Sequence, residues 1–169
     1  MIIVVEGIDR IGKTTMCEKL SKAFGFPIYK EPGVHEATQI GNVRSQMSLL
    51  NLCKVAGCNV IFDRLFSSEY VYGMCDRKCS PFASRNFLNL AIDLFLQIKD
   101  AIYISMQPTD VEKSSAEHGT SLRRHSHLFV SCDKLLIDKG FKNFYAGTYD
   151  DIDSIVEELV WLYGGKING

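Results

Sequence analysis

The sequence predicts an α/β fold in which a five-stranded parallel sheet carries helices on both faces. Short apolar segments alternate along the chain with longer segments of helical periodicity, which is typical of parallel strands joined by right-handed crossovers. Residues 7–14 also have the pattern G-x-x-x-x-G-K-T between an apolar segment and a helical one. In that context the pattern forms a phosphate-binding loop at the end of a strand.

Five strands are expected from short apolar runs that turn residues interrupt. The second is expected to end at Glu31-Pro32-Gly33, because Pro and Gly stop regular structure, and Asp63-Arg64 stands at the end of the third. In chain order the expected strands are residues 2–5, 26–30, 58–62, 101–106 and 142–146.

Five helices are expected from apolar residues three and four positions apart. The clearest is 82–99, where Phe87, Leu90 and Leu94 mark one apolar face. Gly57 is expected to close the second helix as a C-cap, and Gly164-Gly165 to end the last one. In chain order the expected helices are residues 14–24, 37–55, 82–99, 121–139 and 150–163.

Length and composition indicate one domain over residues 1–169, since the chain is of ordinary domain size and 46% of its residues are hydrophobic. The charge is balanced, with 19 Lys and Arg against 20 Asp and Glu, so the net field does not indicate a nucleic-acid or membrane partner. No apolar run approaches the roughly 20 residues that span a bilayer. Six cysteines without a signal peptide indicate reduced thiols and a cytoplasmic location, in the host if the protein is viral.

The loop is expected to bind ATP with Mg²⁺. Gly7 and Gly12 let the backbone turn its N–H groups inward, and the N-terminus of the next helix adds partial positive charge. Lys13 is expected to reach the β- and γ-phosphates and Thr14 to bind the metal, while Thr15 caps or packs the helix. The expected nucleotide-binding residues are Gly7, Ile8, Asp9, Arg10, Ile11, Gly12, Lys13, Thr14 and Thr15.

Three segments are expected to meet at one edge of the sheet. The loop, Glu31-Pro32-Gly33 and Asp63-Arg64 each follow a strand, and ligands of parallel sheets bind at the carboxyl ends of the strands. In-line phosphoryl transfer brings two anionic groups within about 3–3.5 Å, so catalysis depends on positioning and on positive charge. Lys13, Arg10 and Arg64 fit that need, and we expect them to be catalytic.

These motifs resemble the nucleotide and nucleoside kinases of the thymidylate kinase type over most of the chain. G-I-D-R-I-G-K-T-T resembles the eukaryotic-type thymidylate kinase loop, K-E-P-G resembles R-E-P-G after strand two, and F-D-R-L resembles D-R-Y after strand three. Each motif is modest by itself, but the three in this order are specific. The resemblance implies a P-loop kinase fold.

The resemblance also implies roles for individual residues. Asp9 would accept a hydrogen bond from the 3′-hydroxyl of the acceptor's sugar, and Arg10 would touch the transferring phosphoryl group. Asp63 would lie near Mg²⁺ and its waters, so it joins Thr14 as a metal-site residue and is also expected to be catalytic. Arg64 would hold the acceptor phosphate, and Arg44 resembles the arginine that contacts the acceptor after the E-P-G loop.

The chain departs from the family in two places. Leu65 replaces the usual aromatic residue after Asp-Arg. Beyond it, Glu69, Tyr70 and Tyr72 lie one to two helical turns from Arg64, so they either line a base pocket or join the core. We expect Glu69 and Tyr70 to bind the acceptor.

The second departure is a short lid, expected at about residues 109–124. Its Arg123 and Arg124 either reach the donor phosphates on closure or form a solvated helix face. Arg10 already supplies an arginine from within the phosphate loop.

The first functional hypothesis is ATP-dependent phosphorylation of a deoxypyrimidine nucleoside monophosphate, dTMP or a 5-substituted dUMP, to the diphosphate. One alternative is a deoxynucleoside kinase in which Glu31 is the general base for a 5′-hydroxyl. Another is a kinase of 5-hydroxymethyluracil in DNA, and a non-enzymatic nucleotide switch is a fourth possibility. A homodimer through helices 37–55 and 82–99 is possible, although both helices could be buried within one subunit.

Overall fold

The computed structural model describes residues 1–30, 39–75, 84–108 and 121–167, without the side chains of 39–45, 121–122 and 166–167. Five parallel strands form one sheet in the order β2-β3-β1-β4-β5. They are β1 (Ile2–Glu6), β2 (Ile28–Lys30), β3 (Val60–Asp63), β4 (Ala101–Met106) and β5 (Phe144–Gly147). The predicted five-stranded parallel sheet is therefore confirmed.

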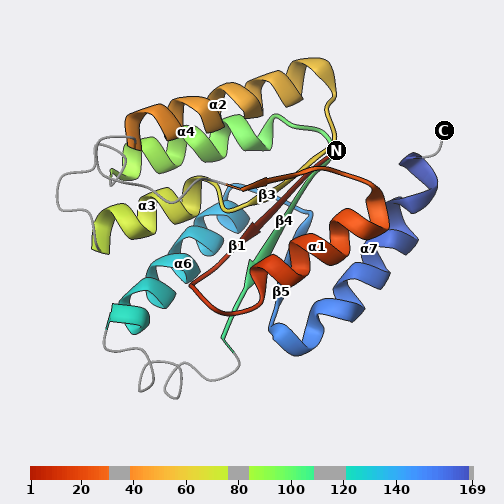
Figure 1. The fold of residues 1–169 in the computed structure, drawn as a ribbon. Coiled ribbons are helices and arrows are strands. Elements are labelled where there is room, and N and C mark those ends of the chain that lie inside the picture. Colours follow the sequence, from red (N-terminus) through yellow and green to blue (C-terminus); the bar gives the residue numbers. More distant parts are fainter. Residues whose placement is uncertain (31–38, 76–83, 109–120, 168–169) are drawn as a thin grey trace.

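Helices cover both faces of this sheet (Figure 1). α1 and α7 pack against each other on one face, and α3 packs with α4 and α6 on the other, where α2 lies against α4. The described helices are α1 (Lys13–Phe24), α2 (Gln39–Ala56), α3 (Phe66–Cys75), α4 (Arg85–Leu96), α6 (Ser121–Asp138) and α7 (Ile152–Ile167), with a 3₁₀ turn, η2, at Tyr149–Asp151.

Two expectations about helices need correction. The helix α3 was not among the expected helices, because its apolar residues do not follow a single stripe: seven of its ten residues are buried. The last helix was expected to end at Gly164-Gly165, and that is wrong, since α7 continues to Ile167. A glycine inside a helix costs only about 1 kcal/mol, so it does not by itself end one.

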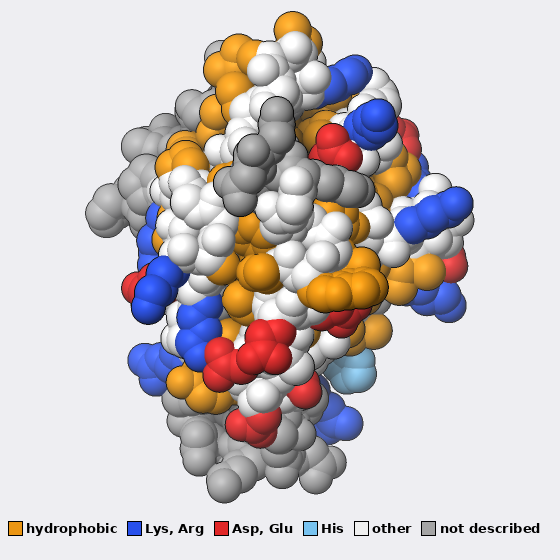
Figure 2. All heavy atoms as spheres, turned by 90° about the vertical axis from the view of Figure 1, so that its right-hand side faces the viewer, with side chains coloured by type: hydrophobic (Ala, Val, Ile, Leu, Met, Phe, Trp, Pro, Cys, Tyr) orange, Lys and Arg blue, Asp and Glu red, His pale blue; other side chains and the backbone are white. Residues whose placement is uncertain are grey.

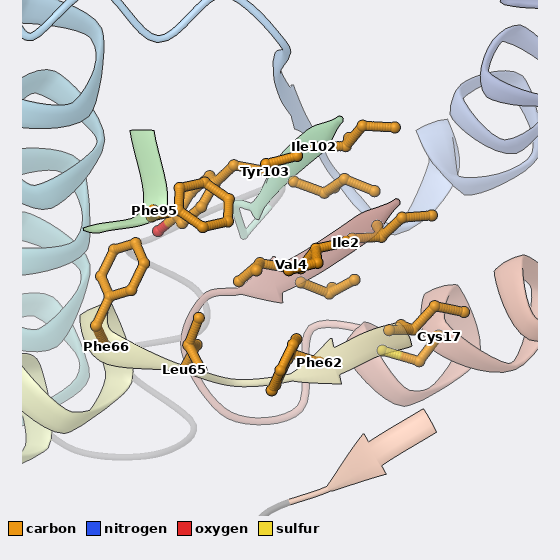
Figure 3. Packing of buried hydrophobic residues seen from close by; sticks show 14 of the residues in the cluster. Ile2, Val4, Cys17, Phe62, Leu65, Phe66, Phe95, Ile102 and Tyr103 are labelled. Carbon is orange, nitrogen blue, oxygen red and sulfur yellow. The ribbon is translucent and has the colours of Figure 1, made fainter. Parts of the chain in front are cut away.

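The core lies on both sides of the three central strands. Every residue of β1, β3 and β4 is buried, as expected for parallel strands covered on two faces. On one face Phe66 of α3 and Phe95 of α4 meet Tyr103 of β4, with ring centroids 5.5 to 6.3 Å apart (Figure 3). These rings fix α3 and α4 on the sheet.

Alternation along the strands sends neighbouring side chains to opposite faces of the sheet. The register pairs Val4 with Tyr103 and Glu6 with Ser105, so these residues share the face that α3 and α6 cover. Asp63 pairs with Val5 and therefore belongs to the opposite face, which α1 covers. The sheet thus directs two buried carboxylates, Glu6 and Asp63, to opposite sides.

A third buried carboxylate fastens α6 to the end of β4. Ser105 Oγ donates a hydrogen bond to Asp133 Oδ2 at 2.5 Å, and Gln107 Nε2 donates to the same oxygen at 3.1 Å. No described residue provides a partner for the other oxygen, Oδ1, which is buried. Burial raises the pKa of Asp133 to about 6, although the hydrogen bond from Ser105 opposes the rise.

Apolar side chains also remain on the surface. They include Leu52 and Val55 on α2, Leu90 on α4, and Trp161 on α7, which is 82% exposed. Figure 2 shows hydrophobic side chains gathered near the middle of the face that includes α7. The predicted homodimer therefore has more than one apolar surface available to it and stays a prediction. In the part of the chain that the structure describes, none of the helices is long and apolar enough to cross a membrane.

The stability of the protein is expected to depend on pH through Asp133. Between about pH 4 and 6 the folded state keeps the Asp133 proton that the unfolded chain has released, so the free energy of unfolding falls as the pH rises. The isosteric variant Asp133→Asn should lose this dependence, which amounts to about 1–3 kcal/mol. Urea unfolding of both proteins at pH 4 to 7 measures it. Parallel pH profiles for the two proteins would contradict the assignment.

Candidate active site

The phosphate-binding loop begins where β1 ends and closes at the first residue of α1. Its two glycines adopt positive φ angles, 137° at Gly7 and 91° at Gly12. A Cβ at Gly7 would lie 2.3 Å from the backbone oxygen of Met106, so no other residue fits there without a backbone shift. Arg10 has a φ of 64°, a conformation that costs a residue with a side chain about 1 kcal/mol or more. The loop is thus a strained turn packed closely against the end of β4.

Lys13 lies inside this loop and is only 5% exposed. Its Nζ donates a short hydrogen bond to the backbone oxygen of Ile8, across the loop. Burial, and to a smaller extent the positive charge of Arg64, lowers the pKa of Lys13 to about 8, although Asp9 and Asp63 oppose the shift. A phosphate group beside the ammonium would strongly favour its charged form.

Two ion pairs bring the ends of three strands together. Lys30, at the end of β2, places its Nζ 3.3 Å from Asp63 Oδ2 at the end of β3. Arg64, which follows β3, pairs through Nη2 with Asp9 Oδ1 of the loop. The Asp63 side chain is 4% exposed, whereas Lys30 and Asp9 reach solvent. The predicted meeting of the loop with Asp63-Arg64 is present in the structure.

Contacts on three sides fix Arg64. Its backbone has a φ of 81°, and its N–H donates to the backbone oxygen of Val5 at 3.1 Å, which extends the pairing of β3 with β1. Its Nη1 donates to Ser68 Oγ at 3.4 Å. The guanidinium lies over the ring of Tyr72, 5.0 Å from the centroid, in a cation–π arrangement. This arginine is therefore oriented before any anion arrives.

A cavity of about 410 Å³ opens between these elements. This volume is within the range of small-molecule sites. Four basic side chains and two acidic ones line it, which leaves an excess of positive charge. Its described lining consists of Asp9, Arg10, Gly12, Lys13, Thr14, Lys30, Asp63 and Arg64. The composition and the phosphate loop together suit a polyanionic ligand.

The chemistry of two lining residues fits Mg²⁺. Thr14 offers a hydroxyl and Asp63 a carboxylate, and oxygen ligands completed by waters and phosphates are what this ion prefers. Among the described residues no cluster of three or more His, Cys, Asp or Glu side chains could hold a metal ion. These two residues would hold the ion together with the phosphates of a nucleotide.

Several predicted residues do not line the cavity. Ile8 and Ile11 are buried, so only the backbone of the loop is available at these positions. Tyr70, 9% exposed, belongs to the hydrophobic core, and Glu69 is buried beside it on α3. The assignment of Glu69 and Tyr70 to an acceptor pocket remains a prediction.

The two arginines of the expected lid lie elsewhere. Arg123 and Arg124, with Met74 and His127, line a second cavity of about 420 Å³ between α3 and α6. Arg124 Nη2 donates to the backbone oxygen of Met74 at 3.5 Å. The described contacts do not test whether these arginines reach the donor phosphates, so that contact stays a prediction.

Two further predicted residues cannot be placed at the site. Glu31 lies outside the described residues, as does most of the expected lid. Arg44 belongs to α2, but its side chain is also outside them.

Three residues at or beside the site were not predicted. Lys30 was expected only as part of a strand, although it stands next to the E-P-G motif. Tyr72 was noted on the same helix but not assigned a contact with Arg64. No sequence pattern indicated a role for Glu6, because its hydrogen-bond partners are distant in the chain and come into contact with it only in the folded protein.

Comparisons with known proteins agree with this geometry. No protein-family model matches the chain. A protein of the Acidianus bottle-shaped virus (isolate Italy/Pozzuoli), which carries the provisional name of a thymidylate kinase, is 26% identical over 163 residues. The match spans 90% of this chain and 99% of the viral protein.

Solved structures show the same fold. YorR protein from Bacillus subtilis, in complex with phosphorylated GDP, has a TM-score of 0.68 and 23% identity, covering 100% of this chain and 99% of that one. Deoxyadenosine kinase from M. mycoides with bound dCTP has a TM-score of 0.56 and 16% identity, covering 98% and 100%. Thymidylate kinase from Candida albicans has a TM-score of 0.54 and 18% identity, covering 99% and 92%.

The fold and the phosphate loop are those of P-loop kinases. With the viral relative, they confirm the resemblance that the sequence predicts: the chain is similar to the thymidylate kinases.

Nucleotide binding should be coupled to proton uptake at Lys13. With a pKa of about 8, Lys13 is partly neutral at pH 8, and phosphates that bind beside it should restore its proton. Affinity for ADP should therefore fall as the pH rises above 8. Calorimetric titration with ADP at pH 8, where the phosphates of ADP are already ionised, should show the uptake as a difference in heat between two buffers of different ionisation enthalpy. Lys13→Met is the control, and equal heats in both buffers for the wild-type protein at pH 8 would refute the coupling.

Proposed function

We propose that this kinase transfers the γ-phosphoryl group of ATP to the 5′-phosphate of a deoxypyrimidine nucleoside monophosphate, dTMP or a 5-substituted dUMP, and releases the diphosphate. The observation that supports it best is the single cavity in which the phosphate loop, Lys30 and Arg64 converge with an excess of positive charge. Two phosphate-bearing ligands need such a surplus, because their mutual repulsion opposes close approach.

The donor side of the reaction belongs to the loop and α1. Lys13 and the backbone N–H groups after Gly7 would bind the donor phosphates, and the left-handed backbone at Arg10 directs this residue to the cavity lining. Mg²⁺, if held by Thr14 and Asp63, would neutralise negative charge on the donor phosphates. Arg10 would contact the phosphoryl group as it moves.

The acceptor side belongs to the residues that follow β2 and β3. Arg64 would bind the acceptor phosphate with its planar guanidinium, a geometry suited to two parallel hydrogen bonds. The phosphate would replace the Asp9 carboxylate as its partner, which frees Asp9 to accept a hydrogen bond from the sugar 3′-hydroxyl. The Asp9–Arg64 ion pair thus holds both side chains at the place where the acceptor would bind.

The choice of base rests on the viral relative, whose provisional name is that of a thymidylate kinase. The four basic side chains that line the cavity outnumber its two carboxylates, Asp9 and Asp63. This excess of positive charge favours a phosphate acceptor over a neutral nucleoside. The contact of Arg44 with the acceptor, and that of Arg123 and Arg124 with the donor, belong to the same proposal.

Acceptor specificity can be measured directly. With ATP and Mg²⁺, dTMP and 5-substituted dUMP should be converted to diphosphates, whereas deoxynucleosides and DNA containing 5-hydroxymethyluracil should not, with products identified by mass. Arg64→Ala should lower kcat/KM for the acceptor by roughly 10²- to 10³-fold, because it removes a charged partner of a phosphate. Lys139→Ala, which removes a surface ion pair with Asp93, is the control. Turnover of a nucleoside or of DNA alone would reject the proposed acceptor.

The deoxynucleoside kinase alternative has one observation in its favour. The Lys30–Asp63 pair places the residue before Glu31 at the cavity, so Glu31 follows a lining residue directly. If a 5′-hydroxyl were the acceptor, Glu31 would be its general base. We expect Glu31→Gln to retain turnover of dTMP within about tenfold, since a phosphate acceptor needs no base. Loss of turnover with a nucleoside acceptor, but not with a monophosphate, would favour the alternative.

A further inference from the structure

The buried carboxylate of Glu6 connects the phosphate loop to the acceptor arginine. Glu6 is the last residue of β1, directly before Gly7, and its exposed fraction is 0%. It does not line the cavity. A carboxylate so deeply buried carries a large desolvation cost and must be compensated by hydrogen bonds.

The hydrogen bonds of Glu6 cap the N-terminus of α3. Its Oε1 accepts from the backbone N–H groups of Leu65 at 2.8 Å, Ser67 at 3.1 Å and Ser68 at 3.2 Å. Those N–H groups have no partner within the helix, and Leu65, which precedes α3, has no side-chain acceptor to offer. A residue 59 positions earlier in the chain therefore does what a local Ser or Asp does in other helices.

The same carboxylate reaches Arg64 through one hydroxyl. Ser68 Oγ donates a short hydrogen bond to Glu6 Oε2 and accepts one from Arg64 Nη1 at 3.4 Å. Because the hydroxyl proton is committed to Glu6, a lone pair of Ser68 Oγ is available to the guanidinium. The positive φ of Arg64 is an unfavourable backbone conformation, which persists only where the surrounding structure holds it in place.

We propose that Glu6 is a positioning residue for phosphoryl transfer: through Ser68 and the first turn of α3 it fixes Arg64 relative to the phosphate loop. The inference rests on the proposed function, in which Arg64 binds the acceptor phosphate. It assigns Glu6 and Ser68 a role in acceptor binding that neither residue could have by direct contact, since neither lines the cavity.

The proposal is tested by kinetics with two substrates. Glu6→Gln keeps the shape of the side chain and one acceptor oxygen for the N–H groups of α3, but replaces the oxygen that accepts from Ser68 Oγ by an amide NH₂ group. Ser68→Ala leaves the cap in place and removes only the connection to Arg64. Both variants should raise the KM for the acceptor monophosphate by roughly tenfold while the KM for ATP stays within about twofold.

The control is Asp133→Asn, which changes another buried carboxylate on this face of the sheet. Its contacts with Ser105 and Gln107 do not involve Arg64, so both KM values should remain those of the wild-type protein. A purely structural role of Glu6 would lower the amount of active enzyme without separating the two KM values. If Glu6→Gln does not fold, Ser68→Ala decides the question.

Arg64→Ala distinguishes the failure of this inference from the failure of the proposed function. If Arg64→Ala raises the acceptor KM and folded Glu6→Gln and Ser68→Ala do not, the positioning role is overturned and the proposed function stands. If Arg64→Ala leaves the acceptor KM unchanged, the role of Arg64 in the proposed function fails and the inference fails with it. A selective rise in all three variants supports both.

Discussion

The central strand β1 is the constraint on which the rest of the structure depends. It pairs with β3 on one side and β4 on the other, and all five of its residues are buried. The strand cannot shift without breaking two ladders and exposing its apolar side chains to water. Its end is therefore a fixed point inside the molecule, and the phosphate loop begins there. The close approach of Gly7 to the oxygen of Met106 shows how little space remains around that point.

The charged groups around the loop follow from this geometry. Parallel pairing puts the ends of β1, β2 and β3 at one edge, so Lys30, Asp63 and Arg64 meet residues of the loop. Each carboxylate of the cavity has a basic partner, Asp9 with Arg64 and Asp63 with Lys30. When a phosphate binds, a basic side chain exchanges its carboxylate partner for the phosphate. Because the ion pairs already orient the basic side chains, little further ordering is needed.

Much of the fold was predictable because its signals are local. The five strands and the expected helices correspond to described elements, since apolar runs and helical spacing depend only on neighbouring residues. The helix α3 was not predicted because it is buried on most sides and because its N-terminal cap is Glu6 of a distant strand. The continuation of α7 past Gly164 was not predicted because the low helix propensity of glycine is a weak signal, which tertiary context can override.

By itself, the sequence determined the phosphate loop, the succession of the strands and of the helices other than α3 along the chain, and the identity of Asp63-Arg64 as a strand-end pair. Each of these depends on residue type and spacing over a short stretch of chain. The tertiary structure alone decided that Asp9 pairs with Arg64, that Tyr72 stacks beneath that arginine, and that Glu6 caps α3. These contacts join residues up to 62 positions apart, the separation of Glu6 and Ser68. They arise only when parallel pairing brings separate strand ends to the same edge, and no local pattern in the chain encodes which side chains then pair there.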